Sequence, residues 1–136
     1  MSLFAGLFFS AKAPDKFSGK KELVYLMGSA KFDVEIVGDE DVQPTLEIIC
    51  SPHRPQGANC YETASFKLEN DKAVRVEILG KKIGSLTPQA ASFFRQQLIT
   101  RGIPKGVGQC AAVIRGGSID SDGRKRPYKV WLDLPI

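Results

Sequence analysis

The chain has 136 residues, of which 43% are hydrophobic and 25% are charged. This length accommodates one domain with one core, and the composition excludes wholesale disorder. The formal charge of +4 is uneven, because residues 1–71 carry 7 Lys/Arg and 11 Asp/Glu whereas residues 72–136 carry 12 and 4. A basic second half suits a polyanionic partner, although a solvated basic surface with no partner explains it equally well.

The sequence predicts an N-terminal arm and linker over residues 1–22 and a single domain over residues 23–136. The run at residues 3–9 is apolar and includes Phe4, Leu7, Phe8 and Phe9. No basic residue precedes it, which argues against a signal peptide, and no segment approaches the roughly 20 apolar residues of a membrane-spanning helix. We expect a cytoplasmic protein without a membrane partner. The Phe-rich arm would pack on the domain, on a protein partner or on a second copy; a membrane-surface anchor is the other interpretation.

The first part of the domain predicts two strands and a helix. Residues 23–27 form a short strand, and residues 32–37 alternate strictly before Gly38, which is typical of a half-buried strand. An acidic turn at residues 39–41 follows. Residues 43–50 then predict a two-turn helix, because Pro44 stands near its first position and apolar residues recur at helical spacing. These apolar residues are Leu46, Ile49 and Cys50.

The middle of the chain predicts a loop at residues 51–59 and an alternating strand at residues 60–68, with Tyr61 and Phe66 on opposite faces. Residues 70–71 form a turn into a strand at 74–78. Gly80 supplies the positive φ of a short hairpin, whose second strand is residues 82–86. These elements predict an antiparallel unit at the centre of the fold.

The last part predicts a capped helix and two closing strands. Thr87 is a helix N-cap and Pro88 takes the first helical position. The helix buries one stripe and ends near Gly102. Its stripe contains Ala91, Phe94 and Leu98, with Ala90 and Ile99 beside it. Strands at residues 109–114 and 128–134 close the chain. The predicted fold is mainly β with two helices (α+β): a small, partly open β-barrel of the oligonucleotide/oligosaccharide-binding kind (OB-like).

Three cysteines, Cys50, Cys60 and Cys110, are an odd number without a C-x-x-C pair. This pattern argues against a disulfide scaffold and favours a reducing compartment with small buried thiols. With His53, the three cysteines could supply a zinc site, but their spacing matches no common zinc motif. We therefore expect no cofactor and no metal.

Five segments resemble, in order, the HIRAN domain. They are residues 32–38 (Phe-Asp-Val-Glu-Ile-Val-Gly), 70–74 (Asn-Asp-Lys-Ala-Val), 80–86 (Gly-Lys-Lys-Ile-Gly-Ser-Leu), 112–117 (Ala-Val-Ile-Arg-Gly-Gly) and 132–135 (Leu-Asp-Leu-Pro). HIRAN domains are small β-barrels that stand alone in bacteria or are fused to DNA-remodelling helicases, and one eukaryotic relative captures the 3′ end of single-stranded DNA. The resemblance implies an OB-like binding module associated with DNA repair. It places Asn70 and Asp71 at polar pocket positions.

Binding of a single strand requires a basic groove and flat rings for base stacking. Tyr61, Tyr128 and Trp131 could supply the rings if they face outward, although burial is the usual state of a lone tryptophan. The predicted nucleic-acid-binding residues are Asn70, Asp71, Lys72, Lys81, Lys82, Ser85, Arg115, Arg124, Lys125, Arg126 and Lys129. A charged hairpin tip such as residues 124–126 can also serve solubility alone.

An enzyme is not expected. His53 is the only histidine and has no neighbouring nucleophile motif, Asp120 and Asp122 form only half of a calcium loop, and residues 106–108 lack the context of a dinucleotide site. We therefore predict a non-catalytic module that binds single-stranded nucleic acid, including DNA ends. The alternative is a protein-interaction or assembly module that keeps the barrel but has lost the pocket.

Overall fold

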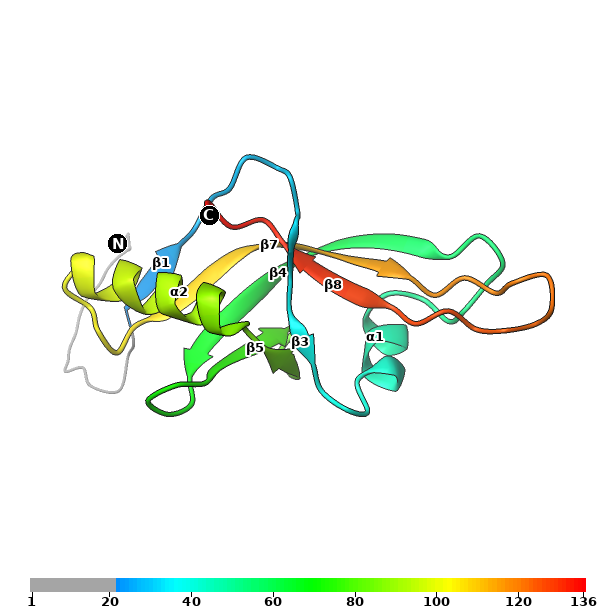
Figure 1. The fold of residues 1–136 in the computed structure, drawn as a ribbon, viewed down its shortest axis with the longest axis horizontal. Helices are drawn as coiled ribbons and strands as arrows, with labels where there is room; N and C mark the ends of the chain where they lie inside the picture. Colours follow the sequence, from blue (N-terminus) through cyan, green and yellow to red (C-terminus); the bar gives the residue numbers. More distant parts are fainter. Residues whose placement is uncertain (1–21) are drawn as a thin grey trace, which may run out of the picture.

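The computed structural model describes residues 22–136, whose strands join one curved sheet (Figure 1). The sheet runs in the order β2-β8-β7-β4-β5-β6-β3. β2 (Val34–Glu35) and β3 (Val37–Gly38) are consecutive pieces of one extended segment. This segment pairs with β8 (Lys129–Leu132) through β2 and with β6 (Lys81–Ser85) through β3. The sheet thereby closes into a nearly complete antiparallel barrel, which confirms the predicted fold class.

β7 (Val107–Gly116) pairs with three other strands of the sheet. β4 (Ala58–Leu68) pairs antiparallel along one edge of it, with Ala58 opposite Gly116 and Phe66 opposite Gly108. The other edge of β7 is shared by β8, which is antiparallel, and by the short β1 (Leu23–Tyr25), which is parallel. Both predicted closing strands are therefore present. β7 extends beyond the predicted residues 109–114 at both ends, whereas β8 is shorter than the predicted residues 128–134.

The central hairpin is present as predicted. β5 (Val74–Ile78) pairs with β6, and its three apolar residues point into the core while Arg75 points outward. The turn between them has positive φ at Leu79 (52°) and Gly80 (77°). Two consecutive positive φ values match the twist of the flanking strands.

α2 (Pro88–Thr100) packs across one end of the barrel (Figure 1). The Thr87 side chain accepts a hydrogen bond from Ala90 N at 3.3 Å, which confirms the predicted N-cap. The Phe94 ring lies edge-on to Phe66 in the barrel core, with ring centroids 5.5 Å apart. Ala90, Ala91, Phe94 and Leu98 form the buried stripe. Ile99, expected beside this stripe, is instead 61% exposed, because its position turns away from the core.

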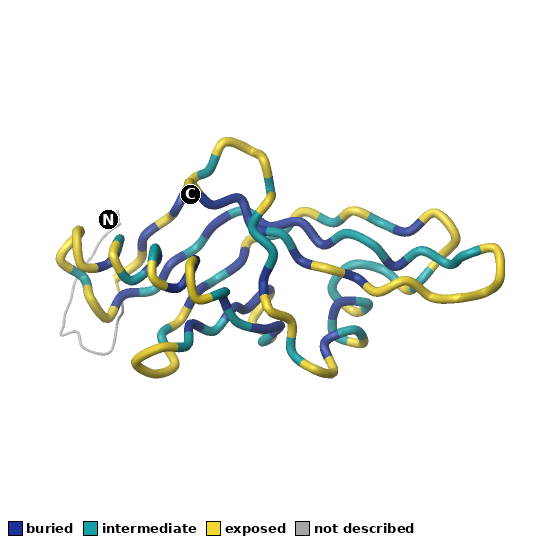
Figure 2. Tube along the Cα trace, in the orientation of Figure 1, coloured by how far each residue is buried: buried dark blue, intermediate teal, exposed yellow. Residues whose placement is uncertain are grey.

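α1 (Gln43–Ile49) lies near the other end of the barrel, under β8. Proline stands in its first turn and Leu46 is buried, as the sequence predicts. The helix ends one residue before Cys50, which forms its C-cap. Figure 2 shows that burial follows the strands, whereas the long loop between β7 and β8 is exposed.

The strand predicted over residues 32–37 is shorter and interrupted. Phe32 has φ 48°, in the left-handed region, so pairing begins only at Val34. Ile36 divides β2 from β3, and there the segment passes from β8 to β6. Ile36 N still donates to Val130 O at 3.2 Å, and its side chain is buried. The predicted arm, up to residue 21, lies outside the described residues.

Candidate nucleic-acid interface

An exposed tyrosine lies on the outer face of the barrel. Tyr61 of β4 is 63% exposed and lies opposite Val113 of β7, which in turn lies opposite Trp131 of β8. Val113 points out of the barrel, because its neighbours Ala112 and Ile114 belong to the core, yet it is fully buried. Its side chain is therefore covered on the outer face, where its cross-strand neighbours are the two aromatic residues.

Phe32 completes this group of rings. Its ring lies edge-on to Tyr61, with centroids 5.4 Å apart. The loop that carries it has positive φ at Ala30 (67°) and Phe32 (48°). Residues other than glycine adopt this conformation only at a cost in conformational free energy. The buried Asp133 holds the loop by accepting a hydrogen bond from Lys31 N at 3.2 Å. We call Phe32, Tyr61, Val113 and Trp131 the aromatic face.

The three rings considered from the sequence have different environments. Tyr61 is exposed, Trp131 is partly buried and Tyr128 is buried in the core at 2% exposure. Tyr128 also donates its hydroxyl proton to Ser51 O at 2.6 Å. Only Tyr61 thus offers an open ring, and strand alternation indicated which side it faces. Phe32 was not identified from the sequence, because only a positive φ turns its ring onto the outer face.

Two of the predicted cations lie beside the aromatic face. Arg115 of β7 is opposite Lys129 of β8 and also opposite Asn59 of β4, one outer-face position beyond Tyr61. Lys129 Nζ is 3.7 Å from Glu35 Oε2, and both side chains are largely exposed, so this ion pair is weak. The sheet therefore places positive charge next to an open ring.

The tip of the β7–β8 loop is less basic than its sequence indicates. Arg124 pairs with Asp122 at 3.2 Å and Arg126 pairs with Asp120 at 2.9 Å, in contacts that are both exposed. Lys125 forms an isolated bridge with Ile119 through the backbone. The tip carries its own counter-charges, so its attraction for a polyanion is partly offset.

The remaining predicted residues lie elsewhere on the barrel. They belong to β6 and the loop before β5. In the sheet, β4 and β5 separate β6 from Arg115 in one direction, and β8 and the β2–β3 segment separate them in the other. Lys82 pairs with Glu69 at 3.3 Å. The Asn70 side chain accepts hydrogen bonds from Lys72 N and Ala73 N, both at 2.8 Å, which shapes its own loop. The exposed residues of this second group are Asn70, Asp71, Lys72 and Lys81, and Lys82 and Ser85 are partly exposed on β6.

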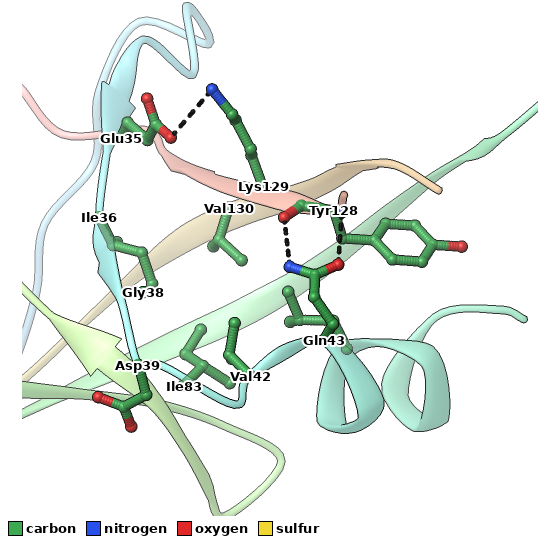
Figure 3. Close-up of a pocket in the computed structure, with 11 residues that line it drawn as sticks. Glu35, Ile36, Gly38, Asp39, Val42, Gln43, Ile83, Tyr128, Lys129 and Val130 are labelled. Atoms are coloured by element: carbon green, nitrogen blue, oxygen red, sulfur yellow. Dashed lines mark hydrogen bonds and ion pairs between the residues drawn. The ribbon is translucent and has the colours of Figure 1, made fainter. Parts of the chain in front are cut away.

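A small pocket opens where β3 separates from β8 and α1 approaches (Figure 3). It holds about 200 Å³ and has an apolar floor that includes Ile36, Ile83 and Val130. The Gln43 amide closes one side: its Nε2 donates to Tyr128 O at 3.0 Å, and its Oε1 accepts from Tyr128 N at 2.7 Å. Both polar groups of the Gln43 side chain are therefore hydrogen-bonded to the main chain of Tyr128, just before β8.

The cysteine prediction was wrong for two of the three residues. Cys50 at the end of α1 and Cys60 on β4 form a disulfide, with Cα atoms 5.7 Å apart. Their separation in sequence gave no signal for this bond, which depends on how α1 packs below β4. The disulfide is at odds with the expected reducing compartment. Cys110 is a buried free thiol as predicted, and burial raises its pKa from 9.0 to about 12.

The zinc ligand set considered from the sequence is not assembled. Cys50 and Cys60 are bonded to each other, and residues 22–136 contain no cluster of three or more His, Cys, Asp or Glu suited to a metal. His53 is instead a link between elements: its Nδ1 is 2.8 Å from Glu47 Oε2 of α1, and its Nε2 is 2.9 Å from Arg126 O. The imidazole ring thereby bridges α1 and the β7–β8 loop.

In three comparisons, no family model, no curated protein and no solved structure matches the chain. The resemblance to the HIRAN domain therefore stays a prediction from the sequence. Within the described part of the chain, no helix combines the length and the apolar character needed to cross a membrane.

Proposed function

We propose that this protein is a non-catalytic module that binds single-stranded nucleic acid on the aromatic face. The observation that carries this proposal is the ring of Tyr61, which lies on the outer face of β4 and is 63% exposed. Arg115 of β7 and Lys129 of β8 lie at the next outer-face position. A base can stack on an open ring while neighbouring cations attract its phosphates. The resemblance to HIRAN domains favours DNA, its ends and a role in DNA repair.

The test is the binding of fluorescently labelled oligodeoxythymidine, followed by anisotropy between about 50 and 200 mM salt. Tyr61→Ala should weaken binding by about tenfold, because base stacking on an aromatic ring contributes about 1–3 kcal/mol. Tyr61→Phe keeps the ring and should bind like the wild type. Equal affinities for both variants, or no binding by the wild type at low salt, would contradict the proposal.

The alternative, an interaction or assembly module, rests on a separate observation. Leu23 and Tyr25 of β1 and Met27, two residues after its end, are exposed in alternation, at 56%, 46% and 75%. Contiguous exposed apolar side chains on a strand are typical of protein contacts. This alternative becomes the favoured function if wild-type protein binds no oligonucleotide and sediments as an oligomer.

A further inference from the structure

The loop before β4 and the start of the β7–β8 loop lie together at the far end of the β4–β7 ladder (Figure 1). A polar groove lies between them. It is open, with a volume of about 410 Å³. Its lining residues are Arg54, Gln56, Gly57, Ala58, Asn59, Gly116 and Ser118. None of these is acidic, and the side chains of four of them can donate hydrogen bonds.

Arg54 is held in position at the groove by both its main chain and its side chain. Its N donates to Gly117 O at 3.0 Å, and its carbonyl accepts from Gly57 N at 2.9 Å. Its Nε donates to Gly57 O at 2.9 Å, which fixes the side chain and leaves the two terminal amino groups of the guanidinium for a ligand. A guanidinium held in this way is suited to phosphate, because its planar fork can donate two parallel hydrogen bonds.

The floor of the groove depends on two glycines. Gly57 has φ 69°, and a Cβ added there would lie 2.6 Å from Gly116 O. Gly116 has φ 122°, and a Cβ there would lie 2.3 Å from Pro127 O. The loop before β4 therefore approaches β7 closely only because Gly57 has no side chain, and the missing side chain of Gly116 lets Pro127 approach β7 in the same way.

The groove continues the aromatic face. Asn59 lines the groove and stands two residues from Tyr61 on the same face of β4, about 7 Å away along the strand. A single nucleotide spans this distance. Arg115, which lies opposite Asn59, adds a cation between the ring and the groove.

We propose that this groove binds a phosphate group of the strand whose base stacks on Tyr61, with Arg54 as its main ligand. This inference rests on the proposed function. A phosphate suits the site better than a protein carboxylate because the groove adjoins an open ring at nucleotide spacing. The ring, the cation and the groove would thus place the bound strand along β4.

The test compares Arg54→Gln with Lys105→Gln, which removes the same charge from the turn after α2. Arg54→Gln should weaken oligodeoxythymidine binding about tenfold and reduce the slope of log affinity against log salt by about 0.7, the value for one phosphate contact on a single strand. Lys105→Gln should change neither. Arg54→Lys, which keeps the charge but loses the fork, should lie between them.

Amide chemical shifts during titration with inorganic phosphate or thymidine monophosphate separate the two proposals. Shifts at Gly57, Asn59 and Ser118, absent in Arg54→Gln, support a phosphate site in the groove; if the wild type then binds no oligonucleotide, the proposed function fails and only the phosphate site stands. Oligonucleotide binding that Arg54→Gln leaves unchanged overturns the groove and leaves the proposed function intact. Binding of an oligoglutamate peptide with the same shifts and no response to phosphate would instead assign the groove to acidic peptides, overturning the phosphate proposal.

Discussion

At the scale of single residues, the neighbours of a side chain decide whether its hydrogen-bonding groups remain free to bind a ligand. Asn70 was expected at a binding pocket, but its amide oxygen is occupied by two backbone N–H groups of its own loop, and its carbonyl accepts from Arg95 Nη2 at 2.6 Å. An Asn occupied in this way defines a turn. Arg54, which sequence reasoning did not select, has a guanidinium with free donors.

Cys110 gives a prediction at this scale. The folded protein should react very slowly with a thiol reagent at pH 8, because the thiol is buried and its pKa is raised to about 12 by that burial. In denaturant without reductant one cysteine should be labelled, and after reduction all three, counted by mass spectrometry. Rapid labelling of the native protein would contradict the burial of Cys110, and three labels without reductant would contradict the disulfide.

At the scale of elements, the disulfide and His53 both connect α1 to the sheet. The disulfide joins the C-cap of α1 to β4, and His53 joins Glu47 of α1 to the β7–β8 loop. α1 is only 7 residues long, too short to be stable alone. Its position therefore depends on these cross-links and on the buried Leu46.

Removing the disulfide should destabilise the protein. The double variant Cys50→Ser/Cys60→Ser should lose about 3 kcal/mol of unfolding free energy, because the bond constrains a loop of the unfolded chain. Urea unfolding followed by circular dichroism measures this loss. Cys110→Ala, which removes the free thiol, is the control and should retain most of the stability. A loss below about 0.5 kcal/mol would show that the bond is not formed in solution.

At the scale of the whole molecule, closure of the barrel depends on one close approach. A Cβ added at Gly84 of β6 would lie 2.2 Å from Val37 O of β3. β3 pairs with β6 through only two residue pairs, so little else holds this seam together. Because β3 and β2 share one segment, a loss of this pairing opens the barrel.

From the close approach of β3 to β6 we predict the effect of Gly84→Ala. The methyl group should separate β3 from β6, lowering the unfolding free energy by about 2–4 kcal/mol and speeding amide exchange at Asp39, whose N donates across the seam to Ile83 O. Gly38→Ala on the facing strand is the matched control. Its added Cβ would meet Val42 Cγ1 at 3.5 Å, an ordinary contact. Equal stabilities of the two variants would contradict this account of closure.

The local elements of this protein follow from the sequence by itself. Thr87 and Pro88 begin α2, Gly80 makes the hairpin turn, and the alternation in residues 60–68 assigns Tyr61 to the outer face; each depends on backbone preferences or on period-two burial over a few residues. From these elements the sequence also indicated a mainly β barrel with two helices.

Only the tertiary structure decided which distant residues meet. The Cys50–Cys60 bond, the contact of Phe32 with Tyr61 and the groove between Arg54 and Ser118 each join segments whose spacing carries no periodic signal. The separation of the cations on β6 and before β5 from those on β7, β8 and the loop between them follows from strand order. Strand order is set by long-range pairing, in which many residues contribute small energies, so no single motif could reveal it.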